Sequence, residues 1–374
     1  MLPKILIVAD GQGEVYAPAF KKAFADLGCL VETFTWKEYF HHYQYHDRYP
    51  VARGLFRSLY FRFQNKYIVG PAVRKINFDL VRLCELVDPD LVFILRGTHI
   101  FPGTIAKIKE SIDCRIFSYN NDNPFVKGPS FGLWRFFKRS IPLFDHVFAY
   151  RIQDVEGYKK FGANNVSLLR SCFIEERNFP IRDLRSSKYS CDVVFVGHFE
   201  NDGRDVSIKH LLSNNIDVRV YGPGWEKSRY FSFFNKKRCI YGPAWKDYNL
   251  ILNSSKIALV FLSRLNRDTY TRRCFEIPAT KTFMLSEPSE ELKCDFFPPG
   301  VGAEYFTDKE ELLEKVRFYL GHAEARRRVA DAGYEIVVGH RHEIKDRVRT
   351  VLSCYFALSG EGVMDRKKEF EGEF

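Results

Sequence analysis

Residues 257–278 read IALVFLSRLNRDTYTRRCFEIP, and this stretch indicates the fold of the C-terminal half of the chain. Ile257–Leu262 is a short apolar run rich in branched side chains, which is typical of a buried β-strand. A polar turn follows, and Thr271 is expected to cap a helix that begins at Arg272. A buried strand that leads directly into a helix is one βα unit, the repeat from which parallel sheets are built.

Further units of this kind surround the first one. The polar segment Arg170–Ser190 has no hydrophobic period and is expected to be a linker between two domains. Thr307–Glu310 has the capping-box pattern of a helix start, and the chain reads as helical from about Ala323 to Leu358. Four more apolar runs in this half are expected strands: Asp192–Gly197, Asp217–Tyr221, Thr282–Ser286 and Ala303–Phe306.

The N-terminal half repeats the pattern, so the chain is expected to be an α/β protein. We predict two Rossmann-like, doubly wound domains that face each other across a cleft, with ligands bound at the carboxyl ends of the strands. The expected boundaries are residues 1–170, a linker over 171–190, a second domain over 191–345, and a helix with a loose tail over 346–374. The expected N-terminal strands are Lys4–Ala9, Leu30–Phe34, Leu91–Leu95, Arg115–Tyr119 and His146–Tyr150.

Composition restricts the class of protein. Of the 374 residues, 45% are hydrophobic and 28% are charged, which excludes disorder over most of the length. The formal net charge of +10 favours an anionic partner. The nine cysteines are scattered singly without a CxxC pair, which excludes a zinc ribbon and fits a reducing compartment. No leader or spanning segment is evident, so we expect a cytoplasmic protein and leave contact with the inner face of the membrane open.

The polar turn and the helix after Leu262 carry the strongest functional signal. Ser263–Pro278 contains four arginines and two acids. Guanidinium groups beside a helix start suit a diphosphate, and a carboxylate such as Glu276 can accept hydrogen bonds from vicinal ribose hydroxyls. The alternative is a solvated basic turn in which Glu276 offsets the helix dipole.

Several motifs of this half resemble a known family. They are Arg273–Ala279 (RCFEIPA), Phe283–Glu287 (FMLSE), Phe296–Gly300 (FFPPG), Val196–His198 with Arg204, and Tyr221–Trp225 (YGPGW). Together they resemble the C-terminal domain of GT-B glycosyltransferases, in the spore-maturation-protein (CgeB-like) branch of the family 1-like enzymes. The resemblance covers roughly Asp192–His340, and the N-terminal half shows only a weaker likeness at Tyr119–Pro124.

The resemblance implies transfer of a sugar from a nucleotide donor linked to UDP, GDP or dTDP, with no tightly bound cofactor. It implies that Glu276 holds the ribose and that Asp268, eight positions earlier, contacts the sugar. Asp268 is shorter than the usual glutamate, and Lys281 stands where the family usually has glycine. We expect arginines between 264 and 273, rather than a metal, to neutralise the leaving diphosphate. The expected donor-side residues are Gly197, Arg204, Arg264, Arg272, Arg273, Glu276 and Lys281, with His198 and Asp268 as catalytic candidates.

Each of these assignments has a plainer alternative. Gly197 ends a strand, where a glycine lets the backbone approach a diphosphate, and His198 is expected to point into the cleft. A histidine at a strand end also often has a structural role. Arg204 is expected to pair either with a phosphate or with solvent.

The N-terminal domain offers candidates for the acceptor side. Gly11 and Gly13 follow the first strand and either form a tight turn or line the cleft. Asp122 is a candidate general base if the reaction inverts the anomeric centre, and the alternative is an Asx-turn before Pro124. His99 lies at another strand end and is a further acceptor-side candidate.

A basic and aromatic segment, Trp36–Lys75, contains eight Lys or Arg residues and two acids. Within it, apolar side chains recur every four residues, which predicts a helix with an apolar stripe bordered by cations. This composition suits an interfacial helix on anionic lipid or, less well, a nucleic-acid surface. The alternative is a helix packed on its own domain. The stripe is Leu55, Leu59, Phe63 and Tyr67, with Arg57, Arg62 and Lys66 beside it.

We therefore predict a metal-independent glycosyltransferase of polysaccharide biosynthesis that acts on a glycan, a lipid-linked acceptor or another surface polymer. Two other classes stay open. One is a non-catalytic protein of the same fold that binds a nucleotide or a sugar. The other, least favoured, is a nucleic-acid-binding protein that uses the segment 36–75.

Overall fold

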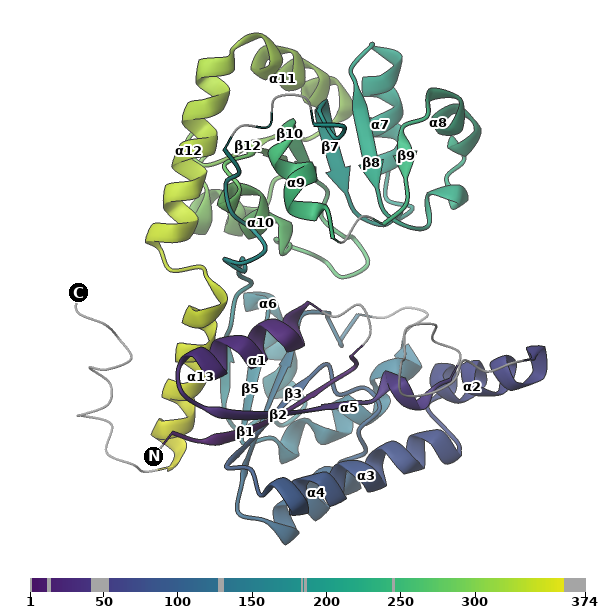
Figure 1. Cartoon of the computed structure of the whole chain (residues 1–374), viewed down its shortest axis with the longest axis vertical. Helices are drawn as coiled ribbons and strands as arrows, with labels where there is room; N and C mark the ends of the chain where they lie inside the picture. Colours follow the sequence, from purple (N-terminus) through teal and green to yellow (C-terminus); the bar gives the residue numbers. More distant parts are fainter. Residues whose placement is uncertain are drawn as a thin grey trace. The chain divides into compact units, whose positions relative to one another are not determined.

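A computed structural model describes residues 2–11, 15–41, 54–126, 131–182, 184, 187–243 and 246–359, with only the backbone at position 131. The chain forms two compact units (Figure 1). The first contains Met1–Arg170 together with Ile344–Phe374, and the second contains Ser171–Glu343. No described helix is long and apolar enough to cross a membrane. All nine cysteines carry free thiols.

The first unit is built on a parallel sheet of six strands in the order β2-β1-β3-β4-β5-β6. Every residue of β3 is buried, because helices cover both faces of the sheet. The sixth strand was not expected from the sequence. It has three residues, all half-buried, and therefore carries little pattern. The strands are β1 Lys4–Ala9, β2 Leu30–Thr35, β3 Leu91–Leu95, β4 Arg115–Asn120, β5 His146–Ala149 and β6 Val166–Leu168.

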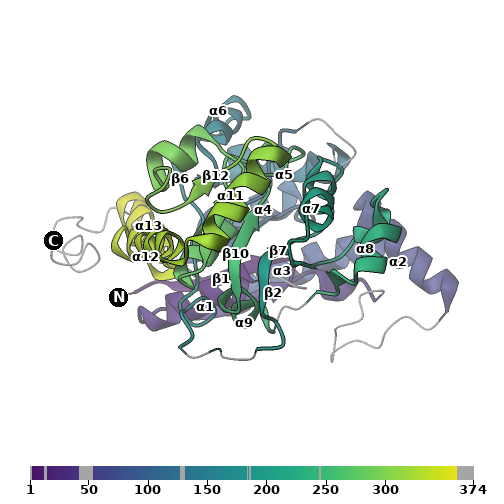
Figure 2. The ribbon, with the colours of Figure 1, turned by 90° about the horizontal axis from the view of Figure 1, so that it is seen from above.

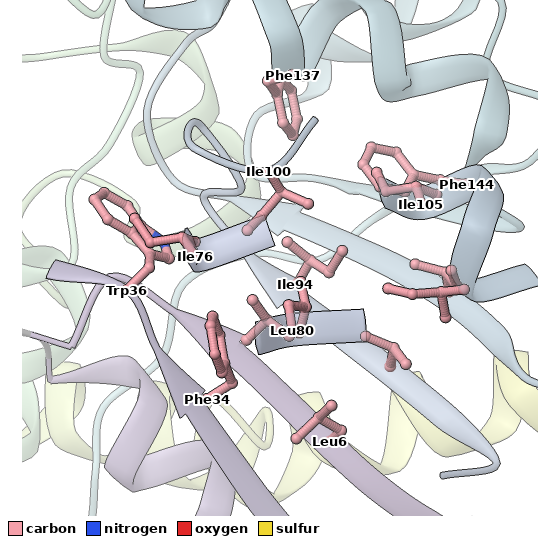
Figure 3. Packing of buried hydrophobic residues seen from close by; sticks show 14 of the residues in the cluster. Leu6, Phe34, Trp36, Ile76, Leu80, Ile94, Ile100, Ile105, Phe137 and Phe144 are labelled. Carbon is pink, nitrogen blue, oxygen red and sulfur yellow. The ribbon is translucent and has the colours of Figure 1, made fainter. Parts of the chain in front are cut away.

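Helices pack on this sheet through apolar stripes. Figure 3 shows Ile76 and Leu80 of α3 lying against Leu6 of β1 and Ile94 of β3, within one buried cluster. The helices are α1 Tyr16–Asp26, α2 Leu55–Tyr67, α3 Pro71–Val87, α4 Pro102–Ser111, α5 Arg135–Ser140, α6 Ile152–Lys160 and α13 Ile344–Ser359, with short 3₁₀ turns at Lys37–Tyr39, Phe131–Trp134 and Ile141–Leu143.

Helix α13 returns to the first unit from the far end of the sequence. It packs on α1, and Lys345 lies 3.4 Å from a carboxylate oxygen of Asp26. The guanidinium of Arg115 donates to the carbonyl of Leu358 at 3.0 Å. The C-terminal helix is thus part of the first unit, and the tail expected beyond it lies outside the described residues.

The second unit has its own parallel sheet, in the order β12-β11-β10-β7-β8-β9. Helices α11 and α12 are adjacent both in sequence and in space (Figure 2). The strands are β7 Cys191–Val196, β8 Val218–Tyr221, β9 Ile240–Tyr241, β10 Ser255–Val260, β11 Phe283–Ser286 and β12 Glu304–Tyr305. The helices are α7 Arg204–Ser213, α8 Phe231–Lys237, α9 Tyr248–Asn253, α10 Arg273–Ala279, α11 Lys309–Gly321 and α12 Ala323–Gly339, with a 3₁₀ turn at Trp225–Lys227 and a π-turn at Leu292–Phe296.

The segment expected to be a linker is attached to the second unit where it is described. Phe173 pairs with Glu343 in an isolated β-bridge. The side chain of Asn253 accepts a hydrogen bond from the backbone of Ile181 at 2.7 Å. Amide side chains on α9 therefore satisfy backbone groups of a segment that has no regular structure of its own.

The strand orders place one switch point in each sheet. In the first sheet β1 lies between β2 and β3, and in the second β7 lies between β8 and β10. At such a point the connections leave in opposite directions, which opens a crevice outside the carboxyl ends of the strands. The candidate residues that follow β1, β3, β7 and β10 are therefore those best placed to bind a ligand.

Candidate functional site

The turns after β7 and β8 cross closely. Gly222 has a φ of +153°, and a Cβ atom at this position would lie 2.2 Å from the carbonyl oxygen of Gly197. That carbonyl accepts a hydrogen bond from Nε1 of Trp225 at 3.0 Å, and the amide of Gly197 donates to Tyr221 at 2.8 Å. Both backbone polar groups of Gly197 are thus bonded within the unit. Its part in the site is to fix the turn that presents His198.

His198 projects from this turn and is held by a carboxylate. Its side chain is 58% exposed, and its Nε2 lies 2.8 Å from Oε1 of Glu200, which is only 9% exposed. The other oxygen of Glu200 accepts a hydrogen bond from the hydroxyl of Ser263 at 2.7 Å. Because Ser263 follows β10, these bonds join the turns after the two strands at the switch point.

Glu200 is strongly acidic. Burial raises its pKa, but the hydrogen bonds from His198 and Ser263 and the charge of Arg204 outweigh burial and lower the pKa to about 2. The carboxylate is therefore ionised at neutral pH and fixes the orientation of the imidazole. Because Nε2 faces Glu200, the nitrogen left for a ligand is Nδ1, which accepts a hydrogen bond in the neutral ring and donates one in the protonated ring.

Arg204 is buried beneath this turn. Its guanidinium, 1% exposed, lies 2.5 Å from Asp202 and donates to the carbonyl of His198 at 2.8 Å. It also lies beside two aromatic rings, 5.6 Å from the centroid of Phe195 and 5.9 Å from that of Phe261. The sequence predicts a phosphate or solvent partner for Arg204. The structure instead uses its donors to hold the backbone of His198 in place.

Asp268 closes the turn after β10. Its amide donates to the carbonyl of Ser263 at 2.9 Å, and its carboxylate lies 3.4 Å from the amide of Ser263. The hydroxyl of the same serine bonds to Glu200. The structure therefore brings His198 and Asp268, two of the expected catalytic residues, into one connected polar cluster at the carboxyl edge of the sheet.

Glu276 is buried on α10 with both oxygens engaged. Its Oε1 lies 2.7 Å from Nε of Arg272, and its Oε2 accepts a hydrogen bond from the hydroxyl of Tyr248 at 2.8 Å. Burial and the adjacent Glu276 charge raise the pKa of Tyr248, which keeps its hydroxyl protonated as a donor. A carboxylate oxygen accepts more than one hydrogen bond, so this fixed group can still receive the hydroxyls of a sugar.

Arg273 has the environment expected of an anion-binding arginine. It is half-buried at the start of α10, and its guanidinium lies 5.8 Å from the ring centroid of Phe195, the same ring that covers Arg204. Its Nε atom is buried and has no hydrogen-bond partner among the described residues. An unsatisfied buried donor on a cation is costly unless a ligand supplies the acceptor.

The start of α10 differs from the sequence expectation. Arg272, not Thr271, is the N-cap residue, and no side chain caps the helix. The helix has only seven residues and includes Pro278. Anion binding here must therefore come from the arginine side chains rather than from a capped helix start.

Arg264 lies exposed in the turn after β10, near another carboxylate. Burial raises the pKa of Glu287, while the charges of Arg204 and Arg264 oppose this. Oε2 of Glu287 accepts a hydrogen bond from the amide of Leu262 at 2.7 Å. Glu287 thus fixes the backbone where the turn begins, and Arg264 stands beside it.

Lys281 is not brought to this site. It precedes β11 and so lies at the amino edge of the sheet, opposite to the edge that carries His198. Its Nζ lies 3.3 Å from Asp331 and 4.6 Å from the ring centroid of Tyr334. Its φ of +58° lies in the left-handed region, which glycine adopts most readily. It borders a separate cavity of about 760 Å³.

The first unit has a second cluster at its own switch point. Asp10, 4% exposed, follows β1 and lies 2.5 Å from Lys37 and 3.9 Å from Arg96. Arg96 also lies 3.3 Å from Asp122. The carboxylate of Asp122 is thus held beside a guanidinium, while the amide of Asp122 donates to the side chain of Asn120.

A cavity of about 480 Å³ opens at this cluster. His99, expected on the acceptor side, lines it but is 2% exposed and stacks on Trp36 with ring centroids 4.0 Å apart. Burial lowers the pKa of His99 to about 3, helped by the charges of Arg96 and Lys37. His99 is therefore neutral and forms part of the cavity wall. Other lining residues are Asp10, Lys66, Tyr67 and Arg135.

Two expectations concern turns in this unit. Gly11 has a φ of +89°, and a Cβ atom there would lie 2.6 Å from Cβ of Thr35, so the turn requires glycine. Gly13 lies outside the described residues.

The chain has one Asp-x-Asp sequence, Asp88–Asp90. It lies at the amino edge of the first sheet, where Asp90 accepts a hydrogen bond from the amide of Lys4.

Three residues that hold the candidate side chains of the second unit were not predicted from the sequence: Tyr248, Glu200 and Ser263. Glu200 and Ser263 are close in sequence to the predicted residues His198 and Arg264. Each is a polar residue that follows a predicted strand, and this position was the signal that could have identified them. Tyr248 is 28 positions from Glu276, and only the packing of α9 beside α10 brings the two together. No local pattern marks it.

Part of the second unit is similar to a known family, and the whole chain is similar to solved structures. Residues 204–353 match the family model described as "Glycosyl transferase-like". No curated protein matches the chain. Solved structures resemble it at low sequence identity. Sucrose-phosphate synthase from Thermosynechococcus elongatus has a TM-score of 0.70 and 10% identity, covering 96% of this chain and 100% of that one.

Two further structures have similar scores. Anabaena HepE, solved in complex with UDP-glucose, has a TM-score of 0.63 and 11% identity over 96% of this chain and 100% of its own. A glycosyltransferase from Rickettsia africae has a TM-score of 0.63 and 10% identity over 96% and 99%. The fold is therefore that of GT-B glycosyltransferases: two Rossmann-like units on parallel sheets, with a helical C-terminus.

Proposed function

We propose that the chain is a glycosyltransferase that binds a nucleotide sugar at the carboxyl edge of the second sheet. The observation that carries this proposal is the half-buried Arg273, whose Nε has no partner among the described residues and which adjoins the buried carboxylate of Glu276 on α10. A guanidinium with an unsatisfied Nε and an anchored carboxylate suit the diphosphate and the ribose of one ligand. The match to a glycosyl transferase-like family model supports this reading.

The donor is proposed to lie across the two turns at the switch point. Arg273 and Arg264 would bind the diphosphate, and Glu276 would accept the ribose hydroxyls. Arg272 and Tyr248 position that carboxylate from either side. UDP is the first nucleotide to test, since HepE, a structural neighbour, was solved with UDP-glucose; GDP and dTDP are the next candidates.

Charge on the leaving diphosphate is proposed to be neutralised by arginine side chains. His198, fixed by Glu200 through Nε2, would donate a hydrogen bond from Nδ1 of its protonated ring to the diphosphate or the sugar, and Asp268 would contact the sugar. Donors fixed before the reaction stabilise developing charge without reorganisation. The motifs in the second unit also support, as a proposal, placement in the spore-maturation-protein (CgeB-like) branch.

The acceptor is proposed to bind in the cavity of the first unit. Its lining includes Lys37, Lys66, Arg96 and Arg135, so it favours an acceptor with anionic groups. A glycan with acidic groups or a lipid-linked sugar phosphate has this character, which places the reaction in the synthesis of a surface polymer. Asp122 would serve as the general base only if the reaction inverts the anomeric centre.

A donor panel tests the proposal. Release of nucleotide from UDP-, GDP- and dTDP-sugars is measured for the wild type, for Glu276→Ala and for Lys281→Ala. We expect release from one nucleotide class, its loss in Glu276→Ala, and unchanged release in Lys281→Ala, because Lys281 lies at the other edge. Binding of a nucleotide without release, with a range of acceptors present, would instead favour a non-catalytic binding protein.

A further inference from the structure

Helix α2 exposes a continuous apolar surface. Its outward side chains are far more exposed than is usual for large apolar residues, with Phe56 at 88% and Leu55 at 71%. Solvated apolar patches of this kind mark contact sites. The sequence left open a helix packed on its own domain, and that alternative does not account for these residues. The exposed apolar side chains of α2 are Leu55, Phe56, Leu59, Tyr60, Phe63 and Tyr67.

These side chains share one face of the helix. At about 100° per residue, the six positions fall within a sector of about 140°. Arg62 lies about 20° outside one edge of this sector and Lys66 about 20° inside the same edge, whereas Arg57 lies about 60° beyond the other edge. The helix contains no acid over Leu55–Tyr67. An apolar stripe with cations along one edge and no acid on the helix is the pattern of a helix that lies in the plane of an anionic bilayer.

The C-terminal end of α2 is attached to the unit through groups outside this sector. Gln64 is 2% exposed, and its side-chain oxygen accepts a hydrogen bond from the amide of Ala72 at 2.9 Å. Gly70, with a φ of +96°, is required beside it, because a Cβ atom there would lie 2.6 Å from that oxygen. Arg135 donates to the carbonyl of Ile68 at 2.9 Å. These contacts fix the last turn of α2 to the unit, and Figure 1 shows the helix at the periphery of that unit.

The last turn of α2 also borders the cavity of the first unit. Asn65, Lys66 and Tyr67 line that cavity together with Arg96 and His99. A bilayer that receives the apolar face would thus lie beside the cavity mouth. The cations that border the stripe, Arg62 and Lys66, would meet lipid headgroups at the same level.

We propose that α2 docks the protein on an anionic lipid bilayer and presents the first-unit cavity to a lipid-borne acceptor. The docking stands on the helix alone, whereas the role of the cavity rests on the proposed function. Charge complementarity favours lipid over a second copy of the chain, because two copies of this face would bring like charges together.

Vesicle binding by the full chain tests the docking. Co-sedimentation is measured with phosphatidylcholine vesicles and with vesicles that also contain about 30% phosphatidylglycerol. We expect binding to the anionic vesicles only, at least about tenfold weaker in Phe56→Ser/Phe63→Ser, and weaker by about fivefold for each charge removed in Arg62→Gln/Lys66→Gln. In Phe63→Trp, fluorescence should shift to shorter wavelength on the anionic vesicles.

Matched variants in the second unit serve as controls. Phe318→Ser removes an aromatic side chain that is 48% exposed, and Lys236→Gln/Lys237→Gln removes two exposed cations. Both should bind vesicles as the wild type does. A thermal melt of each α2 variant confirms that it is folded. The docking would be overturned if the wild type did not co-sediment with anionic vesicles, or if the α2 variants bound these vesicles as strongly as the wild type does.

Other partners give different outcomes. A dimer that Phe56→Ser/Phe63→Ser converts to a monomer, without vesicle binding, would assign the face to a second copy and overturn the proposal. Salt-dependent RNA binding that competes with the vesicles and is lost in Arg62→Gln/Lys66→Gln would assign it to nucleic acid and also overturn it. Vesicle binding needs no donor, so it can succeed where sugar transfer fails.

Discussion

Oε1 of Glu200 lies 2.8 Å from Nε2 of His198, while Oε2 of the same carboxylate accepts a hydrogen bond from Ser263. One buried side chain therefore connects the turn after β7 with the turn after β10. Beneath it, Arg204 holds the carbonyl of His198. The parts of the site that would face a donor are thus supported by residues that a donor would not touch.

The first prediction concerns stability and pH at Glu200. Its folded pKa, about 2, is below its ordinary value of 4.5, so its stabilising effect is present above pH 4.5 and is lost as the pH falls toward 2. Glu200→Gln should lower the free energy of unfolding by about 1–3 kcal/mol at pH 6. Urea melts of both proteins across this pH range should show the difference shrinking at acid pH. A difference independent of pH would contradict the assignment.

Glu200→Gln should also slow sugar transfer more than it weakens donor binding, because the amide loses the charge that fixes His198 in place. Turnover and nucleotide affinity measured on the same preparation separate the two effects. Equal losses in both would indicate that Glu200 only maintains the fold of the turn.

Arg273→Ala should distinguish the diphosphate from the nucleoside. Loss of a charged hydrogen-bond donor should weaken UDP binding by about 10- to 100-fold, with little change for uridine. Glu276→Ala should weaken both, because the ribose is common to both. Calorimetric titration of each ligand provides the comparison. A parallel loss of uridine binding in Arg273→Ala would place Arg273 elsewhere than at the phosphates.

The glycine at 222 should be essential for folding of the second unit. Gly222→Ala should lower the free energy of unfolding by about 2–4 kcal/mol, because its Cβ would clash with the carbonyl of Gly197 in a backbone region that suits glycine. Gly242→Ala is a matched control, since no atom lies within 4 Å of its Cβ position. Thermal melts of the two variants should differ clearly, and similar melting temperatures would rule out the close crossing.

A second pH effect is expected in the first unit. His99 has a folded pKa of about 3, well below 6.5, because it is buried, so the unfolded chain binds a proton first as the pH falls. Stability should therefore fall between pH 6.5 and 3, by at most about 1.4 kcal/mol per pH unit from this residue. His99→Phe, which keeps an aromatic ring on Trp36, should flatten this dependence in urea melts. An unchanged slope would show that His99 takes up its proton in the folded protein.

The fold could be predicted from the sequence where burial dominates. Strand β3, LVFIL, was expected residue for residue because every side chain is apolar and buried. Strand β9 was not predicted, because a strand of two residues at the edge of the sheet is too short to show a hydrophobic period. The helix start near Thr307 was expected, but its cap is Asp308, which accepts hydrogen bonds from the amides of Glu310 and Glu311. Thr307 instead donates through its amide and its hydroxyl to the side chain of Glu311.

The candidate site was predictable only in part. Glu276 and Arg273 stand in one motif, so spacing alone brought them together. Arg204 was expected to pair with a phosphate or with solvent, because charge alone does not show that an arginine is buried against Asp202. Lys281 follows the same motif in sequence, yet the short helix α10 carries the chain from one edge of the sheet to the other. The length of the helix between the motif and a later residue decides at which edge of the sheet that residue lies.

The central claim is that the second unit binds a nucleotide through Glu276 and Arg273. Calorimetric titration of UDP, GDP and dTDP into the wild type and Glu276→Ala tests it most directly. We predict that one nucleotide binds the wild type with a single site and binds Glu276→Ala at least about tenfold more weakly. Absence of binding by all three nucleotides, or equal affinity in the two proteins, would contradict the claim.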